Sequence, residues 1–148
     1  MMFRYRAGFS LIELIVVLVI LAVIAAIAIP RMSRGANNAD ITAMQADLAV
    51  LRGAIELYRV EHTGYPVLAD IKSQLTGKTD KDGTINTSGA YGPYIAVIPP
   101  LKTGAKAGEV DFAAPAAIPP AAEVDDVGWL YDAASGSIWA NDSTHFDK

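Results

Sequence analysis

The feature that most constrains this chain is an apolar run from Phe9 to Ile29, in which only Ser10 and Glu13 are polar among 21 residues. As an α-helix with a rise of about 1.5 Å per residue, the run would be roughly 30 Å long, which matches the hydrocarbon core of a bilayer. It therefore predicts a membrane-crossing helix. On hydropathy alone, an uncleaved signal anchor and a cleaved signal segment are both open, although the run is longer than the apolar core of a secretory signal peptide.

Glu13 is the unusual residue of this run, because a carboxylate inside an apolar span costs about 2.5–3.5 kcal/mol on insertion scales and by default marks a function. In one interpretation, Glu13 lies close enough to the end of the span for its side chain to reach the lipid headgroups. In the other, a positive charge lies nearby. Cleavage between Gly8 and Phe9 would create that charge, since the new α-amino group would precede the carboxylate by four residues.

The residues around the bond between Gly8 and Phe9 resemble a known family motif. The sequence GFSLIEL at residues 8–14, followed by an unbroken apolar run that ends at Pro30, resembles the cleavage and methylation motif of type IV prepilins and type II secretion pseudopilins. The leader MMFRYRAG is similar to the leaders of that family, with Arg4 and Arg6 at matching places.

The roles of three residues follow from this resemblance. It implies that a prepilin peptidase cleaves between Gly8 and Phe9 and that Phe9 is then N-methylated. It also implies that Glu13 pairs with the terminal amine of an adjacent subunit. An ammonium and a carboxylate on different subunits attract strongly at low dielectric, and a subunit shifted along the filament would leave a charge unpaired. We therefore expect Phe9 and Glu13 to set the register of subunit assembly.

The partners and the location are those that the resemblance implies. The expected partners are further copies of the chain in a homopolymeric filament, other pseudopilins or minor pilins, the prepilin peptidase, an inner-membrane assembly platform and membrane lipid. The chain is expected to cross the bacterial inner membrane once, with its N-terminus cytoplasmic and its C-terminal domain periplasmic. It would then join a periplasmic or extracellular filament. Basic residues flank the apolar run in balanced numbers, so charge alone does not set this orientation.

Charge and cysteine content exclude other classes of protein. The net charge is −4, and loss of the leader with Arg4 and Arg6 would change it to −6. A nucleic-acid-binding protein is expected to be basic, so no nucleic acid is expected as a partner. The chain has no cysteine, which excludes disulfides, thiolate-metal sites and a cysteine nucleophile.

After Gly35, a second pattern predicts that a helix continues beyond the membrane. Apolar residues recur at spacings of three and four: Ile41, Met44, Leu48, Leu51, Ile55 and Tyr58. The charged residues are expected on the opposite, solvated face: Asp40, Asp47, Arg52, Glu56, Arg59 and Glu61. Packing of the stripe on the chain's own domain is favoured over a coiled coil, because only about two and a half heptads are present. Residues 63–66 are expected to end the helix.

These patterns predict four parts of the chain. They are a leader peptide at 1–8, a transmembrane and filament-core helix at 9–30, an amphipathic half of the same helix at 31–63, and a C-terminal globular part at 64–148. Pro30 is expected to kink the helix or open a turn, since its ring removes one backbone hydrogen bond and clashes with the preceding turn. Such a kink would let the helix bend as the subunit passes from bilayer to filament.

The C-terminal part is expected to be small and mixed in structure. Residues 67–76 predict a short helix capped by Gly77. Residues 92–100 resemble a segment of major pseudopilins and suit an edge strand or an extended loop. Residues 113–122 indicate an irregular connection. Residues 127–140 predict a β-hairpin, with Trp129, Tyr131 and Trp139 packed against the helix stripe. The expected fold class is α+β, the pilin fold, in which a long N-terminal helix packs on a small antiparallel sheet.

We expect no enzymatic activity and no cofactor. His62 and His145 lack a neighbouring nucleophile or metal-ligand spacing, and both are expected to be solvated. Calcium is a minority hypothesis, because residues 79–86 suit a surface turn better than a calcium loop. The remaining acidic candidates lack ligand spacing: Asp125, Asp126, Asp132 and Asp142.

The function that these observations favour is that of a structural subunit of a type II secretion pseudopilus, cleaved and N-methylated before assembly and supporting protein export. One alternative is a type IV pilin, major or minor, of an adhesion, motility or DNA-uptake filament. The absence of cysteine favours the pseudopilin, since typical type IV major pilins close a C-terminal loop with a disulfide. An alternative of another class is a membrane-anchored binding module that does not polymerise.

Overall fold

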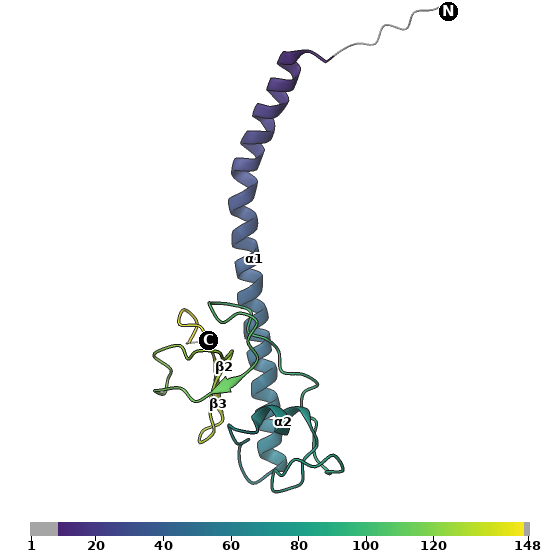
Figure 1. Ribbon diagram of the computed structural model, residues 1–148, viewed down its shortest axis with the longest axis vertical. Coiled ribbons are helices and arrows are strands. Elements are labelled where there is room, and N and C mark those ends of the chain that lie inside the picture. The colour runs from purple at the N-terminus through teal and green to yellow at the C-terminus, as the bar shows by residue number, and fades with distance from the viewer. Residues whose placement is uncertain (1–8, 147–148) are drawn as a thin grey trace, which may run out of the picture. The chain divides into compact units, whose positions relative to one another are not determined.

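The computed structural model describes the backbone of residues 9–146 and the side chains of residues 9–26 and 37–146. Its elements are the helices α1 (Leu11–Glu61) and α2 (Ile71–Thr76) and the strands β1 (Phe112–Ala113), β2 (Trp129–Asp132) and β3 (Ser137–Ala140) (Figure 1). The chain divides into two compact units, with the boundary inside α1 between Asn38 and Ala39. The fold is α+β, with a long N-terminal helix and a small sheet, which is consistent with a pilin fold.

Helix α1 is continuous over 51 residues and includes Pro30. The expectation that Pro30 opens a turn is therefore wrong. A proline removes a single helical hydrogen bond, and the backbone bonds of the neighbouring turns remain. The kink itself stays a prediction, because the side chain of Pro30 lies outside the described residues. The helix ends at Glu61, just before residues 63–66, as the sequence predicts.

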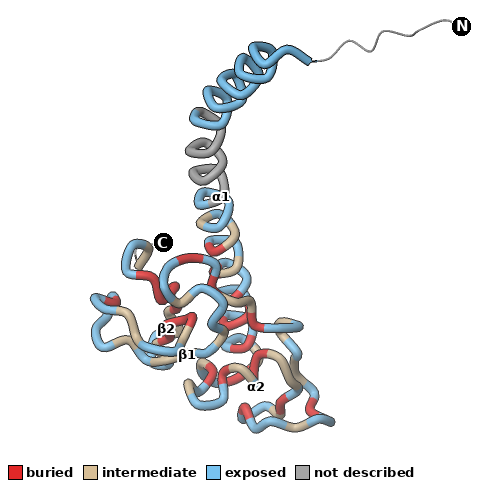
Figure 2. The backbone as a smooth tube through the Cα atoms, turned by 45° about the horizontal axis from the view of Figure 1, so that its top comes forward, coloured by how far each residue is buried: buried red, intermediate tan, exposed pale blue. Residues whose placement is uncertain are grey.

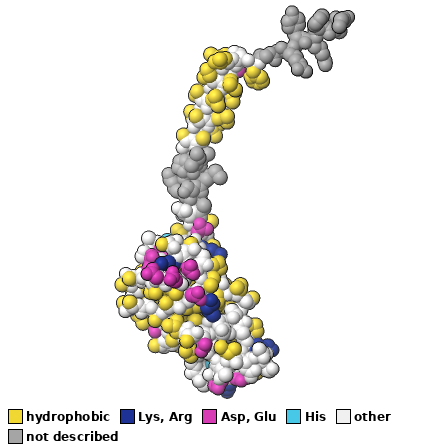
Figure 3. Space-filling model, in the orientation of Figure 1, with side chains coloured by type: hydrophobic (Ala, Val, Ile, Leu, Met, Phe, Trp, Pro, Cys, Tyr) yellow, Lys and Arg dark blue, Asp and Glu magenta, His cyan; other side chains and the backbone are white. Residues whose placement is uncertain are grey.

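The first unit exposes all of its described side chains. Residues 9–26 are exposed on every side of α1 (Figure 2), and hydrophobic side chains cover this part of the helix (Figure 3). Within the described residues, no helix combines the length and the hydropathy that a membrane crossing requires. The span predicted for residues 9–30 includes residues whose side chains lie outside the described set.

The second unit has a hydrophobic core built on the apolar stripe of α1. Met44, Leu48, Leu51, Ile55 and Tyr58 are all buried. They pack with residues of α2, of the loop before β1 and of the hairpin: Ile71, Leu75, Ile98, Leu101, Trp129, Tyr131, Ile138 and Ala140. The prediction that the stripe packs on its own domain is confirmed for these five residues, while Ile41, the first residue of the predicted stripe, is only half-buried and is not part of the core.

The sheet has the strand order β1-β2-β3. Strands β2 and β3 form the predicted hairpin, antiparallel from the pair Trp129 and Ala140 to the pair Asp132 and Ser137. Strand β1, however, pairs with β2 in parallel, so the sheet is mixed and the antiparallel expectation is wrong. Parallel pairing needs a long connection, and residues 114–128 supply it.

One aromatic residue of the hairpin lies outside the core. Trp129 and Tyr131 belong to the core, as predicted, but Trp139 is only half-buried and is not among the core residues. Successive side chains of a strand point to opposite faces. Ile138 and Ala140 occupy the core-facing positions of β3, so Trp139 is left on the other face, beside its strand partner Leu130.

Two further segments refine the predictions for the loops. Helix α2 begins at Ile71 rather than at Val67, because residues 67–70 form a turn in which the Asp70 N–H donates to the Val67 carbonyl. Gly77 caps the helix with extended backbone, and its N–H donates to the Ser73 carbonyl at 2.8 Å. Residues 92–100 form no strand and follow the extended-loop alternative.

Candidate functional site

The start of α1 holds the polar group that the sequence singles out. Ser10 immediately precedes the first helical residue, so it occupies the N-cap position, and Glu13 is the third residue of the helix. The Ser10 N–H donates to Glu13 Oε2 at 3.2 Å, and the Leu14 N–H donates to the Ser10 carbonyl at 3.3 Å. The Glu13 contact is one half of a capping box, in which an acid at the third position bonds back to the N-cap N–H.

This contact holds the Glu13 carboxylate at the N-terminal end of the helix. A negative charge is favourable there, because the helix dipole is positive at that end. A carboxylate has about four acceptor positions on two oxygens, so one N–H leaves room for further donors. The pairing of Glu13 with the amine of a neighbouring Phe9 stays a prediction. Ser10 has a role that the sequence reasoning missed, although the S-x-x-E spacing was visible.

The other predicted residues of this site are described only in part. Phe9 is 86% exposed. Gly8, on the other side of the expected cleavage bond, lies outside the described residues, as does the side chain of Pro30. The large apolar side chains that follow Phe9 in the described part of the first unit are about half exposed or more: Leu11, Ile12, Leu14, Ile15, Val16, Val17, Leu18, Val19, Ile20, Leu21, Val23 and Ile24. So large an exposed apolar surface marks a site of contact with lipid or protein.

His62 is buried, which corrects the expectation that it is solvated. Its ring stacks on Tyr58, with the centroids 3.9 Å apart. Nδ1 lies 2.9 Å from the Tyr58 carbonyl, and Nε2 lies 3.0 Å from the Asp80 carbonyl and 3.1 Å from Thr79 Oγ1. The ring therefore fastens residues 79–80 to the end of α1. Its ring nitrogens are occupied by these contacts, which indicates a structural role rather than catalysis.

His145 is also partly buried and is paired with a buried carboxylate. His145 Nδ1 lies 2.8 Å from Asp142 Oδ2, and Thr144 Oγ1 donates to Asp142 Oδ1 at 2.6 Å. Burial alone would raise the pKa of Asp142, but hydrogen bonds from Thr144, Thr103 and His145 outweigh it and lower the pKa to about 2. Through Thr103, this cluster connects the C-terminal segment to the loop before β1.

Three of the four acidic residues considered for calcium have separate roles. Asp125 pairs with Lys106 Nζ at 2.7 Å, and Asp132 accepts from Ser135 Oγ at 2.6 Å in the hairpin turn. Asp142 belongs to the cluster with His145. Among the described side chains, no group of three His, Cys, Asp or Glu residues is placed to hold a metal ion. The calcium hypothesis gains no support from this part of the chain.

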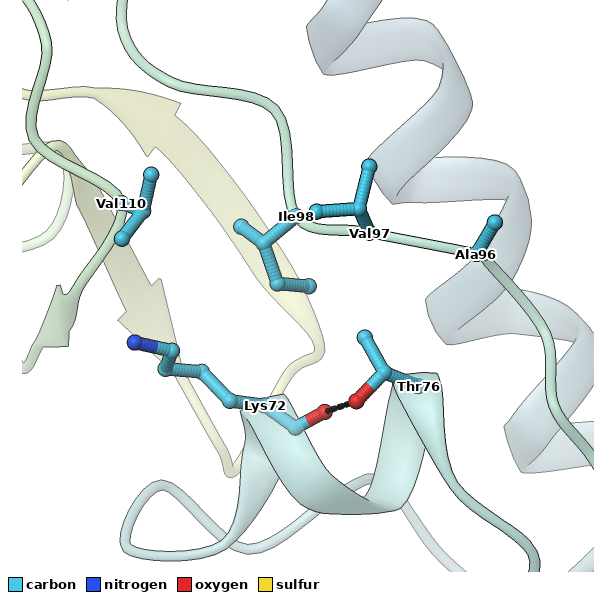
Figure 4. A pocket seen from close by; sticks show the side chains of 6 residues that line it. All are labelled: Lys72, Thr76, Ala96, Val97, Ile98 and Val110. Carbon is cyan, nitrogen blue, oxygen red and sulfur yellow. Dashed lines mark hydrogen bonds between the residues drawn. The ribbon is translucent and has the colours of Figure 1, made fainter.

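A shallow cavity of about 330 Å³ lies between α2 and the loop before β1. It is lined by Lys72, Thr76, Ala96, Val97, Ile98 and Val110 (Figure 4). Lys72 Nζ is paired with Asp111 Oδ1 at 2.6 Å, and Thr76 Oγ1 donates to the Lys72 carbonyl at 2.7 Å. The wall is otherwise apolar, so the cavity lacks the convergent polar groups of an active site.

Comparison with known proteins gives one match, at the N-terminus. The family model described as "Prokaryotic N-terminal methylation motif" matches residues 3–29. No curated protein and no solved structure matches the chain. The motif supports a type IV pilin-like subunit that is processed by a prepilin peptidase and assembles with pilin-like subunits. It is typical of membrane-anchored pilins.

Proposed function

We propose that the chain is a structural subunit of a type II secretion pseudopilus. In this proposal it is inserted into the bacterial inner membrane, cleaved between Gly8 and Phe9, methylated on the new amine, and assembled into a filament that supports protein export. One observation carries the proposal. Residues 9–26, which lie within the methylation motif, are apolar and exposed on every side, with only Ser10 and Glu13 as polar residues.

Such a helix needs an apolar environment both before and after assembly. Burying one Leu, Ile or Val side chain contributes about 1.5–3 kcal/mol relative to water. Lipid supplies this environment in the membrane, and neighbouring helices supply it in a filament. The exchange of lipid for protein has little hydrophobic driving force, because lipid tails are as apolar as the side chains. Polar contacts and close packing must therefore direct assembly.

Glu13 is the polar group that can direct it. The carboxylate is held by the Ser10 N–H at 3.2 Å and retains free acceptor positions. A terminal ammonium on Phe9 of a neighbouring subunit would be a suitable donor, because each charge would be costly if buried alone. Subunits would then join in one register.

The choice of a pseudopilus rests on the C-terminal part. Without cysteine, the chain must hold its C-terminal loop by other means. The buried side chain of Asn141 does so, because its Nδ2 donates to the carbonyls of Val124 and Val127 at 2.6 and 2.7 Å, and its Oδ1 accepts from the Val124 N–H at 3.0 Å. The loop is thus closed without the disulfide of typical type IV major pilins. The proposal assigns no catalytic step to the chain.

Intact-mass analysis of the chain from its native host tests the processing step. The expected mass is that of residues 9–148 with one extra methyl group, and a strain that lacks the prepilin peptidase should retain residues 1–8. A membrane anchor that does not polymerise has no reason to acquire the methyl group. The full-length chain in peptidase-positive cells would contradict the proposal.

Deletion of the gene tests which filament the subunit builds. Loss of secreted enzymes from the culture medium, with surface pili retained, supports the pseudopilus. Loss of surface pili with secretion intact contradicts it and identifies a type IV pilin. Complementation with the wild-type gene should restore the lost phenotype in either case.

A further inference from the structure

The connection between β1 and β2 contains an exposed apolar segment. Residues 113–122, which we call the apolar loop, consist only of alanine, isoleucine and proline. Residues 116–119 are four consecutive exposed apolar residues, which a loop rarely carries without a function. Ile118 is 61% exposed, whereas Pro120 is buried and anchors the loop. Because proline restricts the backbone, the loop should lose little conformational entropy when it binds a partner.

The cavity beside α2 presents a mainly apolar surface. Its volume of about 330 Å³ is near the lower end of the range for ligand pockets, about 300–1,000 Å³. Both polar side chains of its wall already have partners, because Thr76 Oγ1 donates to the Lys72 carbonyl (Figure 4) and Lys72 Nζ pairs with Asp111. Val97, in the same wall, is 70% exposed. An apolar side chain therefore suits this cavity better than a polar ligand, whose burial would cost free energy.

The apolar loop and the cavity have charges of opposite sign beside them. The loop is followed by Glu123, Asp125 and Asp126, and only Asp125 is paired, with Lys106, which leaves a net charge of −2 (three acids and one base). Lys72 is the one charged residue of the cavity wall. Its pair with Asp111 is half exposed and therefore weak, and an ammonium has three donors. Lys72 can thus accept a further carboxylate, so the two surfaces are complementary in charge.

We propose that the cavity is the docking site for the apolar loop of a second copy of the chain, with Ile118 inserted among the alkyl groups of the cavity wall. This inference rests on the proposed function. The loop and the cavity share no residue, so each copy contributes a different surface. Such a heterologous contact leaves one loop and one cavity free and can repeat along a filament. Lipid is a poorer partner for the loop, because anionic headgroups would repel the acidic residues beside it.

Disulfide cross-linking between two copies tests this contact, because the chain has no native cysteine that could react. One copy carries Ile118→Cys, and a second, differently tagged copy carries Val97→Cys. Both positions are exposed, so neither substitution should disturb the fold of the full chain. Oxidation of filaments that contain both copies should give a mixed-tag dimer.

Ile85→Cys on the second copy, in place of Val97→Cys, is the matched control. Ile85 is also an exposed apolar residue of the second unit, but it does not line the cavity, so the mixed-tag dimer should fall to background. Filaments of processed subunits that give no mixed-tag dimer, or no more than the control, would overturn the inference and leave the proposed function intact. The cavity would then serve a different protein. Subunits that keep residues 1–8 and form no filament would contradict both.

A pair of charge substitutions tests whether Ile118 enters the cavity. Ile118→Lys would bring an ammonium into an apolar wall beside Lys72, and Val97→Asp would place a carboxylate against Ile118. Each variant alone should lower incorporation into filaments by about 10- to 100-fold, as expected for the loss of one buried isoleucine. A chain with both substitutions should recover by at least about tenfold, because the new ammonium and carboxylate would meet across the contact.

Ile85→Lys is the control for this pair, since it places the same charge on an exposed isoleucine outside the cavity. It should assemble normally, and the full chains of all these variants should keep the wild-type melting temperature in detergent. Normal incorporation of either single variant would overturn the proposal, as would a double variant that shows no recovery.

Discussion

The two halves of α1 differ in where their partners are. In the second half, five apolar residues from Met44 to Tyr58 are buried by the chain's own α2, loops and hairpin. In the first half, residues 9–26 have no such cover. The difference separates the part of the helix that stabilises the subunit from the part that must be stabilised by its surroundings. Substitutions in the two halves should therefore affect different measurements.

The largest effect is expected for Glu13→Gln in assembly. The amide keeps the shape and the capping contact to Ser10, so helix content in detergent should not change. A neighbouring ammonium would lose its counter-charge, and an unpaired buried charge costs about 3–5 kcal/mol. Incorporation into filaments, measured against co-expressed wild type, should fall at least about a hundredfold, since 1.4 kcal/mol is a factor of ten. Glu56→Gln, at an exposed pair in the second half, is the control. Equal incorporation of the Glu13→Gln and Glu56→Gln variants into filaments would show that the charge of Glu13 has no special role in assembly.

The next largest effect is expected for Leu51→Ala in the stability of the subunit. Leu51 is fully buried, and truncation of a buried leucine costs about 2–5 kcal/mol. Leu18→Ala makes the same change in the first half, where Leu18 is 58% exposed, and should change stability by less than about 0.5 kcal/mol. Denaturant unfolding of the full chain in detergent, followed by far-ultraviolet circular dichroism, checks both. Similar changes in the free energy of unfolding for the two variants would show that both halves of α1 stabilise the subunit equally.

Asn141→Ala should have a smaller effect on the same measurement. It leaves the N–H of Val124 and the carbonyls of Val124 and Val127 without their partner. Unsatisfied buried polar groups cost about 1–3 kcal/mol, so the free energy of unfolding should fall by about 3 kcal/mol. Ser143→Ala, at an exposed neighbour, should be neutral. An unchanged midpoint for Asn141→Ala would mean that the loop is closed by other contacts.

The smallest of these effects depends on pH. The pKa of Asp142 is lowered to about 2 in the folded chain, against an ordinary value of 3.8. Its stabilising contribution is therefore present above pH 3.8 and is lost as the pH falls toward about 2. The loss should be about 2 kcal/mol. Unfolding midpoints between neutral and acidic pH should fall more steeply for wild type than for Asp142→Asn. If the midpoints of wild type and Asp142→Asn fall equally with pH, the lowered pKa of Asp142 does not contribute to stability.

Local patterns in the sequence predict several parts of this fold. The stripe from Met44 to Tyr58 and the hairpin from Trp129 to Ala140 follow from periodicity within a few turns or a single pair of strands. The capping contact between Ser10 and Glu13 is equally local. The charge of Glu13 points to a partner outside the chain, whereas the S-x-x-E spacing also makes it the third residue of a capped helix.

Contacts between distant residues were not predictable in the same way. Strand β1 has two residues, too few to show a period, and the residues of β2 that pair with it lie seventeen positions further along the chain. His62 looks like a solvated residue at a helix end, but residues 79 and 80 fold over its ring. The charged residues Arg52, Glu56 and Arg59 lie on one flank of α1 rather than opposite the core, since each residue turns the helix by about 100°.

The position of the tryptophans has a practical consequence. Both tryptophans of the chain, Trp129 and Trp139, lie in the hairpin, and the indole N–H of Trp129 donates to the Pro99 carbonyl at 2.9 Å. Intrinsic fluorescence therefore reports on the second unit alone. A quencher dissolved in the acyl chains should leave the emission of the native chain unchanged. If one tryptophan is added within residues 9–26, any emission that the quencher removes can then be assigned to that half.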